Sequence, residues 1–75
     1  MEYRGFTVEA VTRDKDGLFY CGEEIGRWDY KFTVRRVKRI IGKVDNLRKK
    51  VGSGWEILAR RYIQNELETS RGTSS

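Results

Sequence analysis

A long amphipathic pattern in the middle of the chain constrains the fold more than any other feature. Apolar side chains recur every three or four residues over residues 34–51, and this spacing places them on one side of an α-helix. Thr33 is a suitable N-cap, and Gly52 is a suitable residue just past the helix C-terminus. We therefore predict a helix that buries one face against another layer. The residues of this apolar stripe are Val34, Val37, Ile40, Ile41, Val44, Leu47 and Val51.

The N-terminal part of the chain alternates between apolar and polar residues, which is typical of half-buried strands. We predict strands over residues 3–12, 18–21 and 27–32. The pair Asp16–Gly17 lies between the first two, and Asp-Gly is a strong hairpin signal because glycine accepts the positive φ that the turn requires. The sequence thus predicts a three-stranded antiparallel β-meander before the helix.

The segment after the central helix fits two structures. Ser53 and Glu56 have the spacing of a capping box, and apolar residues then recur as on a helical face. The alternation over residues 54–59 also fits a strand with Ile57 facing inward. We favour the helix because residues 58–66 are mostly good helix formers.

These elements predict an α+β fold: a three-stranded antiparallel β-meander followed by an amphipathic basic helix and a short C-terminal helix, or a fourth strand in its place. We expect one domain over residues 1–68. Residues 69–75 are rich in serine, threonine and glycine, and we expect them to be disordered. A chain of this size buries only about 60% of its unfolded surface, so its core is small and a homodimer would add stability.

The composition excludes several kinds of catalytic and metal site. The chain has no histidine and one cysteine, so it has no imidazole base, no intrachain disulfide and no four-thiolate zinc site. Cys21 falls within the second predicted strand, and we expect it to be a small buried hydrophobe. Glu23 and Glu24 are adjacent and point to opposite sides of a strand, which does not suit paired-carboxylate catalysis. We therefore expect a protein that is not an enzyme and that holds neither metal nor cofactor.

Hydropathy and cysteine usage bear on the location of the protein. No segment has the long apolar run of a membrane span or a signal peptide. A single cysteine fits a reducing compartment. We expect a cytoplasmic protein that makes no membrane contact.

Charge is distributed very unevenly along the chain. Residues 1–30 carry four basic and seven acidic side chains, a net charge of −3. Residues 31–61 carry eleven basic and two acidic side chains, a net charge of +9, and residues 62–75 have a net charge of −1. A local excess of nine positive charges attracts polyanions, so the expected partner is nucleic acid or an acidic protein surface.

The basic residues of the predicted helix lie mainly opposite its apolar stripe, where they can contact phosphate groups. Guanidinium groups form bidentate contacts with phosphate, whereas ammonium groups act as point charges. Binding of this kind depends strongly on salt. A solvated helix surface is the simpler interpretation of the same pattern. The predicted nucleic-acid-binding residues are Arg35, Arg36, Lys38, Arg39, Lys43, Arg60 and Arg61.

The aromatic residues of the predicted sheet allow a second type of contact. We expect Phe6, Trp28 and Phe32 to lie in the core, and Trp55 to anchor the C-terminal segment onto it. Tyr3 and Tyr20 could lie on the opposite side of the sheet, as a stacking platform for bases or a protein-contact patch. The acidity of the strands argues against phosphate binding on that side.

The sequence thus predicts a small non-enzymatic nucleic-acid-binding protein, for DNA more than for RNA, that uses the basic face of its central helix. The alternative is a protein-binding inhibitor or adaptor, of the phage or mobile-element accessory type, that engages an acidic or nucleic-acid-handling partner protein. Both hypotheses use the same basic residues and differ in the partner.

Overall fold

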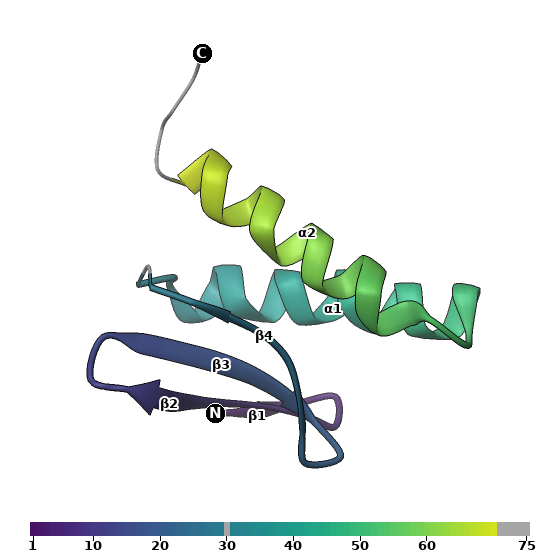
Figure 1. The fold of residues 1–75 in the computed structure, drawn as a ribbon, viewed down its shortest axis with the longest axis horizontal. Coiled ribbons are helices and arrows are strands. Elements are labelled where there is room, and N and C mark those ends of the chain that lie inside the picture. Colours follow the sequence, from purple (N-terminus) through teal and green to yellow (C-terminus); the bar gives the residue numbers. More distant parts are fainter. Residues whose placement is uncertain (30, 71–75) are drawn as a thin grey trace.

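The computed structural model describes residues 1–29 and 31–70. Four antiparallel strands form one sheet in the order β1-β2-β3-β4, and two helices lie on the same side of it (Figure 1). This arrangement confirms the α+β class predicted from the sequence. The elements are β1 (Glu2–Tyr3), β2 (Phe6–Thr12), β3 (Lys15–Tyr20), β4 (Glu23–Trp28), α1 (Val34–Val51) and α2 (Trp55–Ser70).

Two tight turns differ from the expected strands, and the first of them explains why the sheet has four strands rather than three. Arg4 and Gly5 have φ of 52° and 84°, and Cys21 and Gly22 have φ of 53° and 82°. Positive φ at both loop positions is the type I′ conformation, whose twist matches that of the strands it joins. The first turn divides the strand expected over residues 3–12. The second makes Cys21 an exposed turn residue, so the prediction of a buried strand residue is wrong.

The turn predicted at Asp16–Gly17 is also wrong, because the β2–β3 loop consists of residues 13–14. Gly17 lies inside β3 instead. A Cβ atom on Gly17 would lie 2.6 Å from Cγ2 of Val11, closer than such atoms can pack. Glycine is therefore required here by the side chain that closes over the strand.

β4 begins four residues before the strand expected over residues 27–32. Ile25 and Trp28 are three residues apart and would point to opposite sides of a regular strand. A register shift in the pairing of β3 with β4 lets both face the core, where they are 2% and 3% exposed. Phe32 follows the strand and packs edge-on against Trp28 at 5.5 Å between ring centroids. Tyr30, expected in this strand, lies outside the described residues.

Helix α1 has the limits that the sequence predicts. Oγ1 of Thr33 accepts a hydrogen bond from the backbone N–H of Arg36 at 3.1 Å, which caps the N-terminus. Gly52 has φ of 77°, and its N–H donates to the carbonyl of Arg48 at 3.1 Å. The middle of the apolar stripe is buried, but its two ends are exposed: Val34 is 61% and Val51 is 42% exposed.

Helix α2 decides between the two structures predicted after α1. It buries Ala59, Ile63 and Leu67, which recur at the helical spacing of four. Ile57, which the strand alternative turned inward, is 68% exposed. The helix runs through Ser70, two residues past the expected domain boundary, and residues 71–75 lie outside the described residues.

The core lies between one side of the sheet and both helices. Its members come from β2, β3, β4, α1 and α2, so every layer contributes. Gly26 on β4 lets α2 come close, because a Cβ atom there would lie 2.8 Å from Cδ1 of Ile63. Trp55 packs edge-on against Tyr20 at 5.5 Å and Phe6 at 6.1 Å between ring centroids, which joins the start of α2 to the sheet. Trp55 therefore has the anchoring position expected for it.

Candidate nucleic-acid interface

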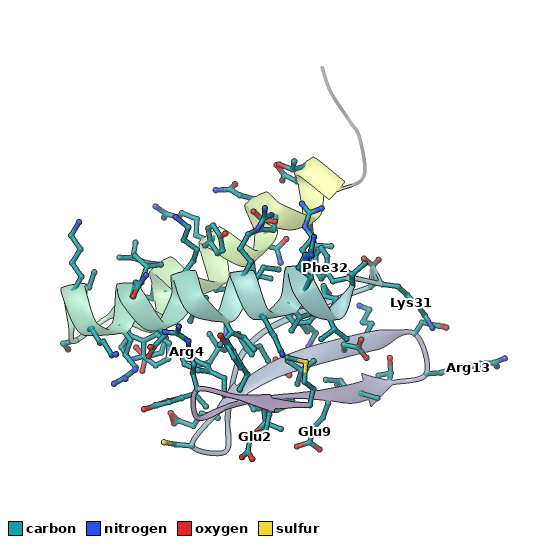
Figure 2. The ribbon with its side chains drawn as sticks, turned by 180° about the vertical axis from the view of Figure 1, so that it is seen from behind. Glu2, Arg4, Glu9, Arg13, Lys31 and Phe32 are labelled. Carbon is teal, nitrogen blue, oxygen red and sulfur yellow. The ribbon has the colours of Figure 1, made fainter. Side chains whose placement is uncertain are left out.

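Helix α1 presents a continuous cationic surface on the side that faces away from the core. Seen from behind in Figure 2, α1 lies in front of α2, and no other element covers its outer side. The side chains of this surface are exposed, and a single half-buried glycine interrupts them. We call this surface the α1 outer face; it consists of Arg35, Lys38, Arg39, Gly42, Lys43, Asn46, Lys49 and Lys50.

The α1 outer face contains no carboxylate. The helix has one acidic residue, Asp45, which is only 4% exposed. The α1 outer face runs from Arg35 to Lys50, which is about 23 Å along the helix axis. Two carboxylates outside this surface still pair with its members, Glu66 with Arg39 and Asp45 with Lys49.

Four of the seven predicted residues lie on the α1 outer face. Arg35 and Lys43 form no ion pair or hydrogen bond with the residues that the structure describes. Nζ of Lys38 lies 5.4 Å from the ring centroid of Tyr3, a cation–π arrangement that leaves the ammonium group exposed. The fourth predicted residue on this face is Arg39, whose side chain is 58% exposed.

Glu66 on α2 holds two of the predicted arginines. Its Oε1 accepts hydrogen bonds from Nε and Nη2 of Arg36 at 3.1 and 3.0 Å, and from Nη2 of Arg39 at 3.1 Å. Burial raises the pKa of Glu66, but the hydrogen bond and charge of Arg36, with Arg39, outweigh it and lower the pKa below its ordinary value. Arg36 is thereby turned toward α2, so it links the helices rather than joining the α1 outer face.

The remaining two predicted residues belong to α2. Nε of Arg60 donates to the carbonyl of Ile25 at 3.1 Å and so satisfies a backbone acceptor on the outer strand β4. Arg61 is exposed and lines a shallow hollow of about 450 Å³ along α2, beside Ile57 and Gln64. Neither residue lies on the α1 outer face, so the structure does not bring all seven predicted residues together.

Asp45 is a buried carboxylate to which the sequence analysis assigned no role. Its Oδ1 accepts a hydrogen bond from Nη2 of Arg48 at 3.1 Å, and its Oδ2 lies 3.4 Å from Nζ of Lys49 and 3.7 Å from Nη1 of Arg4. Burial raises its pKa, yet Arg48 and Lys49 together lower it below its ordinary value. The signal was present, because Arg48 and Lys49 follow Asp45 by three and four residues, which is the spacing of helical ion pairs.

A small groove lies where the α1 outer face meets α2. It has a volume of about 280 Å³ and is lined by Lys43, Asn46, Leu47, Lys50 and Tyr62. Burial, followed by the neighbouring carboxylate of Glu66, raises the pKa of Tyr62. Its lining includes two ammonium groups and an amide, which suit an anionic ligand better than a cationic one.

The predicted aromatic platform on the sheet does not exist in the form expected. Tyr20 packs against Phe6 at 4.6 Å between ring centroids and lies under the guanidinium of Arg48 at 5.1 Å, on the core side. Tyr3 also packs against the core. The open side of the sheet carries acidic groups instead, since Glu2 and Glu9 project from it away from the helices (Figure 2).

No helix within residues 1–29 and 31–70 is long and apolar enough to cross a membrane. The same residues contain no group of three or more cysteine, aspartate or glutamate side chains placed to hold a metal ion. No protein-family model matches the chain, and no curated protein or solved structure matches it. The function must therefore be argued from the α1 outer face itself.

Proposed function

We propose that this protein is a small non-enzymatic DNA-binding protein whose α1 outer face lies against the phosphate backbone. The observation that carries the proposal is the separation of charge on α1. Six cations line its outer side, and its single carboxylate is buried and paired with cations. A helix that only needed to be soluble would have no reason to exclude acidic residues from its exposed side.

Because the cationic residues lie on an α-helix, duplex DNA is a better partner than duplex RNA. The major groove of B-DNA is about 12 Å wide and admits an α-helix, whereas the major groove of A-form RNA is too narrow for side chains to read. The opposite side of the molecule is acidic, as Glu2 and Glu9 illustrate (Figure 2). This polarity would orient the protein with α1 toward the phosphates. We place such a protein in the cytoplasm, in a regulatory role.

The first test is the binding of a fluorescein-labelled 20-base-pair duplex of arbitrary sequence, followed by fluorescence anisotropy at 50 and 200 mM KCl. If four cations each neutralise one phosphate, the fourfold rise in salt should weaken binding about 150-fold. The double variant R35A/K43A removes two cations without known partners, so it should bind more weakly and with a smaller salt dependence. Sedimentation of the free protein and the complex gives the number of copies bound.

Two controls make this experiment specific. R13A/K15A removes the same net charge from the β2–β3 hairpin, where Arg13 projects away from the helices (Figure 2), and it should bind like the wild type. E66Q removes the carboxylate that holds Arg36 and Arg39, and it should bind more tightly.

The proposal is wrong if the wild type does not bind at 50 mM KCl, if binding is indifferent to salt, or if both double variants lose the same affinity. In that case, a protein retained in stoichiometric amount after nuclease treatment of a pulldown would favour the adaptor alternative.

A further inference from the structure

Neither the backbone conformation nor the packing of the fold requires a glycine at position 42. Glycine is the least favourable residue in a helix interior after proline, and Gly42 lies in the middle of α1. Nothing lies within 4 Å of the position that a Cβ atom would occupy there, and the backbone does not have a positive φ. Alanine would therefore fit at this position and would favour the helix.

The other glycines that the structure describes each have a local cause. Four of them have positive φ, which side chains rarely adopt. The remaining two are Gly17 and Gly26, which are covered by neighbouring side chains. A Cβ atom on Gly17 would lie 2.6 Å from Val11, and a Cβ atom on Gly26 would lie 2.8 Å from Ile63. Gly42 is the exception within residues 1–29 and 31–70, because neither its φ nor a neighbouring atom accounts for a glycine there. The four with positive φ are Gly5, Gly22, Gly52 and Gly54.

Gly42 also lies within the cationic surface. Residues three, four and seven positions away are its neighbours on the helix surface. On the N-terminal side these are Arg39, Lys38 and Arg35. On the C-terminal side Asp45, Asn46 and Lys49 follow at three, four and seven positions, and of these Asp45 is buried. The missing side chain thus leaves helix backbone accessible between long cationic side chains.

We propose that a phosphodiester strand of DNA crosses α1 at Gly42, in direct contact with the helix backbone. The inference rests on the proposed function and specifies where the strand lies. At Gly42 the helix is thinner on its outer side. Phosphates can approach there while the flanking ammonium and guanidinium groups reach past the backbone to their oxygens.

The test compares stability with binding in the same variants. G42A should raise the melting temperature because alanine is the better helix former, and yet it should weaken binding of the labelled duplex at least fivefold at 50 mM KCl. G42L should weaken binding further, because its side chain is larger. V34A is the control: it shortens an exposed side chain of the same helix off the α1 outer face, and its affinity should stay within twofold of the wild type.

The outcomes separate this inference from the proposed function. A wild type that binds with the expected salt dependence, together with G42A and G42L that bind equally well, overturns the crossing at Gly42 and leaves DNA binding intact. A wild type that does not bind the duplex overturns both. Weaker binding by the two glycine variants, with a raised melting temperature for G42A and unchanged affinity for V34A, supports the crossing.

Discussion

At the scale of single residues, two carboxylates determine which cations remain available. Asp45 and Glu66 lie at 5% and 15% side-chain exposure, and between them they contact five cationic side chains. Counting charge along the sequence treats every lysine and arginine as equivalent. The distribution of charge therefore identified the helix correctly as the cationic element but could not show that Arg36 is occupied by α2.

Replacing Asp45 tests whether this buried carboxylate stabilises the fold. D45N keeps the shape of the side chain and removes the charge that Arg48, Lys49 and Arg4 share, so we expect a loss of about 1–3 kcal/mol in the free energy of unfolding. Urea denaturation measures it. E9Q removes a carboxylate from an exposed position on the sheet and should change stability by less than about 0.5 kcal/mol. Equal losses in the two variants would mean that the Asp45 cluster has no special role.

At the scale of elements, local signals predicted the helices better than the strands. The cap, the period and the terminal glycine of α1 all lie within or beside the helix, so they can be read without knowing the rest of the fold. The strands depend on distant partners. The register shift between β3 and β4, and the packing of Val11 over Gly17, arise only when strands pair. The Arg4–Gly5 turn was missed because arginine is an unusual residue at the first position of a type I′ loop.

The contact between α2 and β4 makes a prediction about Gly26. A methyl group there would collide with Cδ1 of Ile63, so G26A should cost about 1–3 kcal/mol in the free energy of unfolding. I63V lacks that atom and by itself should cost about 0.5–1.5 kcal/mol. In a double-mutant cycle measured by urea denaturation, G26A should cost less in the I63V protein than in the wild type. Strict additivity would show that the two side chains do not meet.

At the scale of the whole molecule, the fold separates an acidic sheet surface from a cationic helix surface. The sequence predicted both signs, because residues 1–30 and 31–61 have net charges of −3 and +9. It could not predict that both helices cover one side of the sheet, or that Tyr3 and Tyr20 are used by the core. These facts depend on how the layers pack, which short-range patterns do not encode.

The stability of the whole molecule should depend on pH at both extremes. The pKa values of Asp45 and Glu66 are lowered in the folded state, so their stabilisation is complete above the ordinary carboxylate pKa and is lost as pH falls below about 5. The pKa of Tyr62 is raised, so its contribution is present below about pH 10 and is lost above it. Urea denaturation between pH 3 and 11 should show a plateau near neutrality. In D45N, the free energy of unfolding should fall less between neutrality and pH 3 than it does in the wild type. An unchanged fall would exclude Asp45 as its source.

The turn between β3 and β4 has a practical consequence for studying this molecule. Cys21 is the only cysteine of the chain, and its side chain is exposed at the tip of a hairpin rather than buried in a strand. A thiol-reactive dye will therefore attach at one known position of the unmodified sequence. Binding of a partner can then be followed by the fluorescence of the dye on Cys21, so the partner itself needs no label.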